Sequence, residues 1–187
     1  MSFRKKIENF WYYYKWYVLA AIFFIGSFSY IIYDAAKKPE PDLSICYIGN
    51  RASLLGAEKT LEERLVHLIE DVNGDGEKHI EWVEMTFDDD PQKKVTIEAQ
   101  VPALIAAAEC KLFVVNEDYA ESFKNLGVFE EEPVSVDGVS VFAEAGVDTE
   151  NIYAGVRSEP PTMNDFHRLT LKNAKAVLEL IKTEKKG

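Results

Sequence analysis

The sequence predicts an α/β protein in which one N-terminal transmembrane helix precedes a three-layer domain with a mainly parallel sheet. Two observations lead to this prediction. An uncharged apolar stretch runs from Trp16 to Tyr33, and strand-like apolar runs then alternate with helical patterns along the rest of the chain. Such alternation is typical of a parallel sheet covered by helices. We therefore expect a cytoplasmic segment at 1–15, a transmembrane helix at 16–36, a polar spacer at 37–42 and an extracytoplasmic domain at 43–187.

The apolar stretch has the length and the flanks of a membrane span. Its 18 residues would extend about 27 Å as a helix, close to the hydrocarbon thickness of a bilayer. Trp and Tyr residues gather at both ends, where amphipathic rings favour the headgroup region. Four cations precede the stretch and two follow it, namely Arg4, Lys5, Lys6 and Lys15 against Lys37 and Lys38. This excess predicts a single-pass protein of the cell membrane with a cytoplasmic N-terminus.

Three other interpretations of the stretch are less favoured. A cleaved signal peptide fits poorly because the stretch is long and aromatic, and no clean small-residue cleavage site follows it. A lipoprotein fits poorly because the bulky Ile45 stands directly before Cys46. A buried core helix that is apolar all round would need a larger domain than 43–187 around it.

The charge of the domain restricts its partners. Residues 39–187 contain 15 basic and 30 acidic side chains. Such an acidic surface repels phosphate backbones, so we expect no nucleic-acid partner. The two cysteines, Cys46 and Cys110, lie in apolar strand-like runs and are typical of small buried hydrophobes. A single disulfide between them stays open.

The elements of the domain follow from periodicity and breakers. Buried-strand patterns lie at 43–49 and 111–115, and a further strand is predicted at 152–156. The run at 80–87 alternates apolar and acidic residues and predicts a strand nearer an edge of the sheet. Helical patterns lie at 61–69, 97–108, 119–126 and 164–182. Pro102 predicts a break in the second helix, or a fresh start of the helix with proline in its first turn. The pair Asp137-Gly138 between two Val-rich runs predicts a β-hairpin.

A ligand site is expected where the parallel strands end, because open α/β sheets bind ligands beyond the carboxyl ends of their strands. The polar residues at these ends are Asn50, Arg51, Asp88, Asn116, Asp118 and Tyr119. Arg157 follows the 152–156 strand and is either an anion ligand or a surface ion-pair partner. Asp88, Asp89 and Asp90 could also hold a metal ion in an extracellular hydrolase, although a helix N-cap before Pro91 explains one of them more simply.

A calcium loop is a further candidate. Asp71, Asn73 and Asp75 occupy positions one, three and five of an EF-hand-like pattern, with Gly76 at position six and Glu77 next to it. The second half departs from this pattern, because Trp82 stands at position twelve, where a bidentate carboxylate is needed. A plain helix-to-strand turn rich in Asn, Asp and Gly explains the same residues. Calcium is therefore one of two interpretations.

Parts of the domain resemble a known family. The segments LFVVNEDYAESFKNLGVFEEE and VPALIAAAECKLFVV, and IYAGVRS with KNAKAVLELIK, are similar to strand–helix units of type 2 periplasmic solute-binding proteins. The resemblance implies a solute-binding type of fold, but the chain has room for only one of the two lobes. An anchor followed by a small domain also resembles single-pass membrane proteins of Gram-positive bacteria, which implies a location and no activity.

These observations together predict a non-enzymatic extracytoplasmic module that is tethered to the membrane. It would bind a small molecule, a peptide or a membrane protein at the strand ends. The alternative is a structural or accessory subunit of a membrane complex that takes no small ligand.

Overall fold

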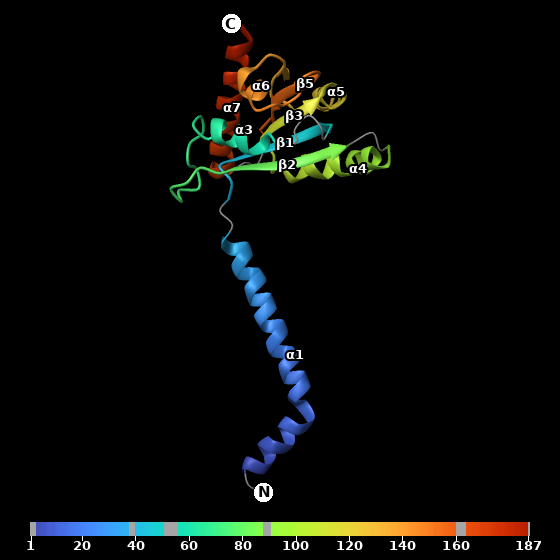
Figure 1. Cartoon of the computed structure of the whole chain (residues 1–187), viewed down its shortest axis with the longest axis vertical. Coiled ribbons are helices and arrows are strands. Elements are labelled where there is room, and N and C mark those ends of the chain that lie inside the picture. Colours follow the sequence, from blue (N-terminus) through green and yellow to red (C-terminus); the bar gives the residue numbers. More distant parts are fainter. Residues whose placement is uncertain (1–2, 38–39, 51–55, 88–90, 160–163, 187) are drawn as a thin grey trace. The chain divides into compact units, whose positions relative to one another are not determined.

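The computed structural model describes residues 3–37, 40–50, 56–87, 91–159 and 164–186 (Figure 1). The chain divides into two units, Met1–Glu40 and Pro41–Gly187. The boundary falls inside the segment predicted as a spacer, 37–42. The two units are described separately below.

The first unit is one long helix, α1 (Phe3–Lys37, 35 residues). A helix of this length extends about 52 Å, which exceeds the thickness of a bilayer core. Within it, Trp11–Ile31 is long and apolar enough to cross a membrane, and none of this stretch is buried. The stretch begins and ends five residues before the predicted span, 16–36. Length and composition make α1 a candidate membrane span or signal sequence.

The second unit is built on one five-stranded sheet with the order β2-β1-β3-β5-β4. The strands are β1 (Leu43–Asn50), β2 (Ile80–Phe87), β3 (Leu112–Asn116), β4 (Val134–Ser135) and β5 (Ile152–Val156). β1 is parallel to both β2 and β3, whereas β5 is antiparallel to both β3 and β4. The α/β class is confirmed, but the prediction of a mainly parallel sheet is wrong because the sheet is mixed. An apolar run indicates a strand without indicating its direction.

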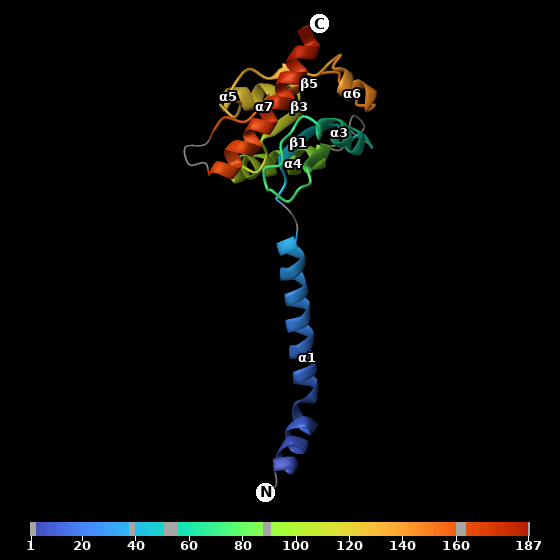
Figure 2. The ribbon, with the colours of Figure 1, turned by 90° about the vertical axis from the view of Figure 1, so that its left-hand side faces the viewer.

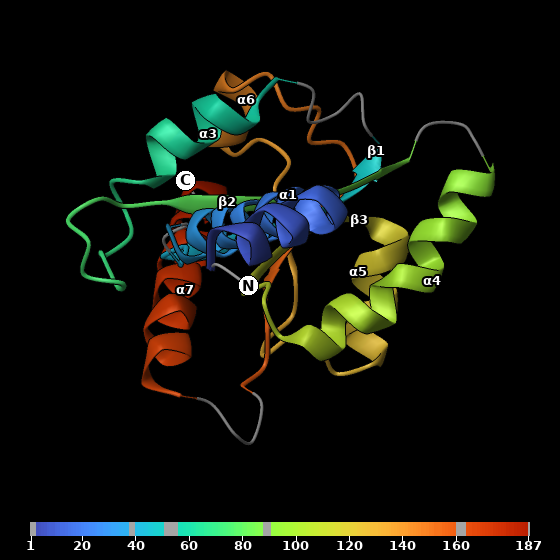
Figure 3. The same ribbon diagram turned by 90° about the horizontal axis from the view of Figure 1, so that it is seen from below.

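Helices cover both faces of this sheet. They are α3 (Glu58–Leu65), α4 (Pro91–Ala107), α5 (Glu117–Asn125), α6 (Ser140–Glu144) and α7 (Asp165–Lys186). α3, α6 and α7 pack on one face (Figure 2), and α4 and α5 pack on the other (Figure 3). Residues of β1 alternate between the two core clusters, with Ile45 and Tyr47 on the first face and Cys46 and Ile48 on the second. Both clusters draw all their residues from Pro41–Gly187, so the core of this unit is complete without α1.

Two local predictions are wrong. The predicted hairpin around Asp137-Gly138 is a turn followed by the short helix α6, because Phe142 becomes part of the core and is only 1% exposed. Gly138 has a φ of 75°, which suits the turn before a helix as well as the turn of a hairpin. Pro102 does not break its helix and lies inside α4.

Asp42 fastens the start of β1 to distant parts of the unit. Its fully buried carboxylate accepts hydrogen bonds from the backbone N–H groups of Val72 (2.6 Å), Asn73 (3.2 Å) and His79 (2.8 Å). Its backbone carbonyl accepts a hydrogen bond from Asn173 Nδ2 in α7 (3.0 Å). Asp42 therefore belongs to the domain, and it holds the 71–79 loop, β1 and α7 together.

Candidate functional site

The mixed sheet brings only some of the predicted site residues together. Asn50 pairs with Phe87, and Val115 pairs with Ile48. Asn50 and Asn116 therefore lie together at the carboxyl ends of β1 and β3. Asn116 has a structural task there, because its Oδ1 accepts a hydrogen bond from Tyr119 N (3.2 Å) and caps α5. Arg51 and Asp88, like Asp89 and Asp90, lie outside the described residues.

Asp118 and Tyr119 lie in the first turn of α5 and differ in environment. Asp118 is exposed and forms an ion pair with Lys94 of α4 (3.7 Å). Tyr119 is only 8% exposed, and its ring packs against Phe87 and Phe123. The turn therefore presents a charge to solvent and directs an aromatic ring toward α4.

The structure places Arg157, a predicted ligand residue, at the opposite end of the strands from Asn50 and Asn116. It follows β5, which runs antiparallel to β3, and its backbone N–H donates to Lys111 O (3.0 Å) at the opposite edge of the sheet. The buried Nε and Nη1 of Arg157 have no hydrogen-bond partner among the described residues. Burial lowers the pKa of its guanidinium from the usual value. Arg157 is thus separated from Asn50, Asn116 and Tyr119 by the length of the strands.

The predicted calcium loop folds as a self-bonded turn. Its side-chain oxygens accept backbone N–H groups of the loop itself: Asp71 accepts from Gly74 (2.7 Å) and Gly76 (3.0 Å), Asn73 accepts from Asp75 (2.8 Å), and Asp75 accepts from Glu77 (2.8 Å). Among the described residues, no group of three His, Cys, Asp or Glu side chains could hold a metal ion. The geometry supports the turn interpretation, and a calcium site formed by Asp71, Asn73, Asp75 and Glu77 stays a prediction.

The two cysteines are free thiols, and both are fully buried in the cluster beneath α4 and α5. Interaction with the Cys110 thiol and burial raise the pKa of the Cys46 thiol. A buried thiol that resists ionisation is a poor nucleophile. Cys46 is therefore a core residue and no catalytic candidate.

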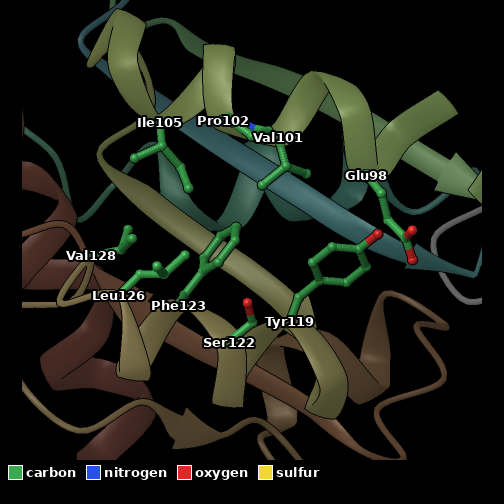
Figure 4. A pocket seen from close by; sticks show the side chains of 9 residues that line it. All are labelled: Glu98, Val101, Pro102, Ile105, Tyr119, Ser122, Phe123, Leu126 and Val128. Carbon is green, nitrogen blue, oxygen red and sulfur yellow. The ribbon is translucent and has the colours of Figure 1, made fainter. Parts of the chain in front are cut away.

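A groove between α4 and α5 is a candidate site formed by described residues (Figure 4). Its volume is about 520 Å³, within the range of small-molecule sites. Val101 and Phe123 are buried beneath it, whereas Leu126 at its rim is 69% exposed. The groove is lined by Glu98, Val101, Pro102, Ile105, Tyr119, Ser122, Phe123, Leu126 and Val128.

One end of the groove is polar. Figure 4 shows the Glu98 carboxylate directed toward the Tyr119 hydroxyl, while Ser122 lies one turn further along α5. That hydroxyl is buried and forms no hydrogen bond with any described residue. Burial, followed by the negative charges of Glu98 and Asp118, raises the pKa of Tyr119. The groove is thus apolar along most of its length and negative at one end.

Of the groove residues, only Tyr119 was predicted from the sequence as a site residue. The apolar residues of α4 gave no separate signal of the groove. Ile97, Val101, Leu104 and Ile105 all lie within one stripe of about 100°, which is the stripe expected to pack on a sheet. Val95 lies on the opposite side of the helix and is 64% exposed.

Comparisons of the chain with protein-family models, with curated proteins and with solved structures found no match. The resemblance to type 2 periplasmic solute-binding proteins therefore stays a prediction. The function is therefore inferred from the fold and the groove alone.

Proposed function

We propose that the protein is a non-enzymatic binding module, held on the extracytoplasmic side of the cell membrane by α1, and that the groove between α4 and α5 is its ligand site. The observation that supports this most is the groove itself. It is an open, largely apolar groove of ligand size, with a few convergent polar groups at one end, which is the usual composition of a small-molecule site.

Two features support the proposed location. The exposed surface of Trp11–Ile31, which is apolar except for Lys15 near its start, suits lipid, and the cations before it favour a cytoplasmic N-terminus. The unit Pro41–Gly187 has a core of its own, so a tether at its N-terminus leaves its fold unaffected. An acidic surface is compatible with a soluble domain exposed to the medium.

The proposal is tested by thermal melting of the isolated unit Pro41–Gly187 against neutral apolar solutes with chains of about six to ten carbons. A ligand at one hundred times its dissociation constant adds about 2.7 kcal/mol to the free energy of unfolding. For a unit of this size the melting temperature then rises by roughly 5 to 10 °C. We expect such a rise with at least one solute.

A pair of matched variants locates the effect. Leu126→Glu places a charge in the apolar wall of the groove, whereas Val95→Glu makes the same change at an equally exposed position of α4 outside it. Both should fold, because both side chains are mostly exposed. We expect Leu126→Glu alone to abolish the ligand-induced rise. A flat response of the unchanged unit to every solute would favour the accessory-subunit alternative.

A further inference from the structure

The polar end of the groove contains more acceptors than donors. The Glu98 carboxylate is exposed, and none of the described cations forms an ion pair with it. The nearest basic residue on the same helix, Lys94, pairs with Asp118 instead (3.7 Å) and lies over the Phe87 ring (5.9 Å). The negative charge of Glu98 is therefore available to an occupant of the groove.

Pro102 adds a second acceptor from the backbone. In an α-helix the N–H of residue 102 would donate to the carbonyl of Glu98, one turn earlier, but proline has no N–H. This carbonyl lacks its helical donor. Both Glu98 and Pro102 line the groove, so the carbonyl lies on the same side of α4 as the carboxylate.

The Tyr119 hydroxyl completes the set. A phenol can donate one hydrogen bond and accept another, and this buried hydroxyl makes neither with the described residues. Its oxygen can accept a hydrogen bond from an occupant of the groove. This end of the groove therefore offers three acceptor groups around one negative charge, namely the Glu98 carboxylate, the Glu98 carbonyl and the Tyr119 hydroxyl, and a ligand head with several N–H donors and a positive charge matches it best.

We infer that the groove binds a small apolar amine: a primary ammonium group at Glu98 and Tyr119, with its apolar body along Val101, Ile105 and Leu126. This inference rests on the proposed function and adds the chemical class of the ligand. A primary ammonium has three donors. A carboxylate head of the same length is repelled by Glu98, and a neutral head leaves the charge uncompensated.

The test compares three probes with one six-carbon chain and different heads, hexylammonium, hexanol and hexanoate. Each is titrated into the isolated unit Pro41–Gly187, and the dissociation constant is read from the NMR shifts of the Ile105, Leu126 and Val101 methyl groups. Methylammonium, which has the head without the body, serves as a further probe. We expect hexylammonium to bind about tenfold more tightly than hexanol, and hexanoate and methylammonium to bind least.

Two variants assign the preference to the groove. Glu98→Gln should reduce the affinity for hexylammonium to that for hexanol and leave hexanol unchanged. Tyr119→Phe, which keeps the ring, should weaken hexylammonium more than hexanol. Glu63→Gln is the matched control, because it removes one exposed carboxylate from α3 on the other face of the sheet, and it should change neither affinity.

The outcomes separate this inference from the proposed function. Equal binding of all three six-carbon probes, unchanged in Glu98→Gln, would overturn the amine preference and leave an apolar ligand site. A preference for hexylammonium that persists in Glu98→Gln would also overturn it, because the charge would act from elsewhere. If no probe shifts the groove methyl groups of the folded unit, both proposals fail.

Discussion

At the scale of single residues, Asp42 contributes more to the stability of the fold than its predicted place in the 37–42 spacer suggests. It is fully buried, and three backbone N–H groups of the 71–79 loop depend on its carboxylate. Buried donors left without an acceptor are costly, and more so when the acceptor was charged.

Replacement of Asp42 should therefore destabilise the whole unit. We expect Asp42→Ala to lower the free energy of unfolding by about 2–4 kcal/mol, because it leaves three partly buried N–H groups without their charged acceptor. Asp75→Ala, which removes hydrogen bonds in the exposed part of the same loop, should cost less than about 1 kcal/mol. Urea denaturation of Pro41–Gly187 measures both, and equal losses would contradict the assignment.

Tyr119 provides a pH-dependent signature of the groove. Its pKa is raised above the ordinary value of 10.0 by burial, followed by the charges of Glu98 and Asp118. The folded state then binds the phenolic proton more tightly than the unfolded state. This contribution is fully present below pH 10 and is lost as the pH rises through the folded-state pKa.

Tyr119→Phe removes that contribution. We expect the stability of the unchanged unit to fall more steeply above pH 10 than that of Tyr119→Phe, whereas the two slopes agree near pH 7. Denaturant unfolding at a series of pH values provides the comparison. Parallel curves above pH 10 would show that the hydroxyl is not buried.

At the scale of elements, Pro102 destabilises the helix in which it lies. It removes one hydrogen bond from α4 while lying mostly exposed. Pro102→Ala should stabilise the unit by about 1–3 kcal/mol because it restores the donor to the Glu98 carbonyl. The same change should weaken hexylammonium binding, since that carbonyl is then occupied. Pro102→Gly, which restores the donor in a poorer helix former, should stabilise less.

The 71–77 loop is an element that forms its own hydrogen bonds without an ion. We expect the melting temperature of Pro41–Gly187 to be the same in calcium and in chelator. A site with a dissociation constant of about 10 μM would add about 2.7 kcal/mol at about 1 mM calcium, a shift that melting detects readily. Such a rise, lost in Asp71→Asn, would establish calcium binding.

The elements also show what the sequence could predict. The runs at 43–49, 80–87, 111–115 and 152–156 became strands because short runs rich in Ile, Val and aromatic residues suit a buried sheet. The direction of β5 and the conversion of residues 140–144 into α6 were missed, because both depend on contacts with distant segments. The groove was missed for the same reason. The groove exists because the sheet leaves parts of α4 and α5 uncovered, and which parts stay uncovered depends on the tertiary packing of the whole domain.

At the scale of the whole molecule, the retention of α1 separates an anchor from a removed signal sequence. We expect the protein from cell membranes to keep its N-terminal segment, because no clean cleavage site follows Trp11–Ile31. Intact-mass measurement of the membrane fraction tests this. A protease added to intact cells should then digest the 41–187 region. Full protection of this region would contradict the proposed orientation, and loss of α1 would contradict the anchor.

The position of Pro41 and Asp42 immediately before β1 also has a mechanical consequence. β1 is hydrogen-bonded to β2 along one side and to β3 along the other. Tension that enters at Pro41 first meets the bonds of Asp42 to the 71–79 loop and to Asn173. Extraction of β1 must then break two ladders of hydrogen bonds, whereas extraction of an edge strand breaks one. We expect a domain tethered in this way to withstand a pull from the membrane better than one tethered through its edge strand, and stretching single molecules from either end would measure the difference.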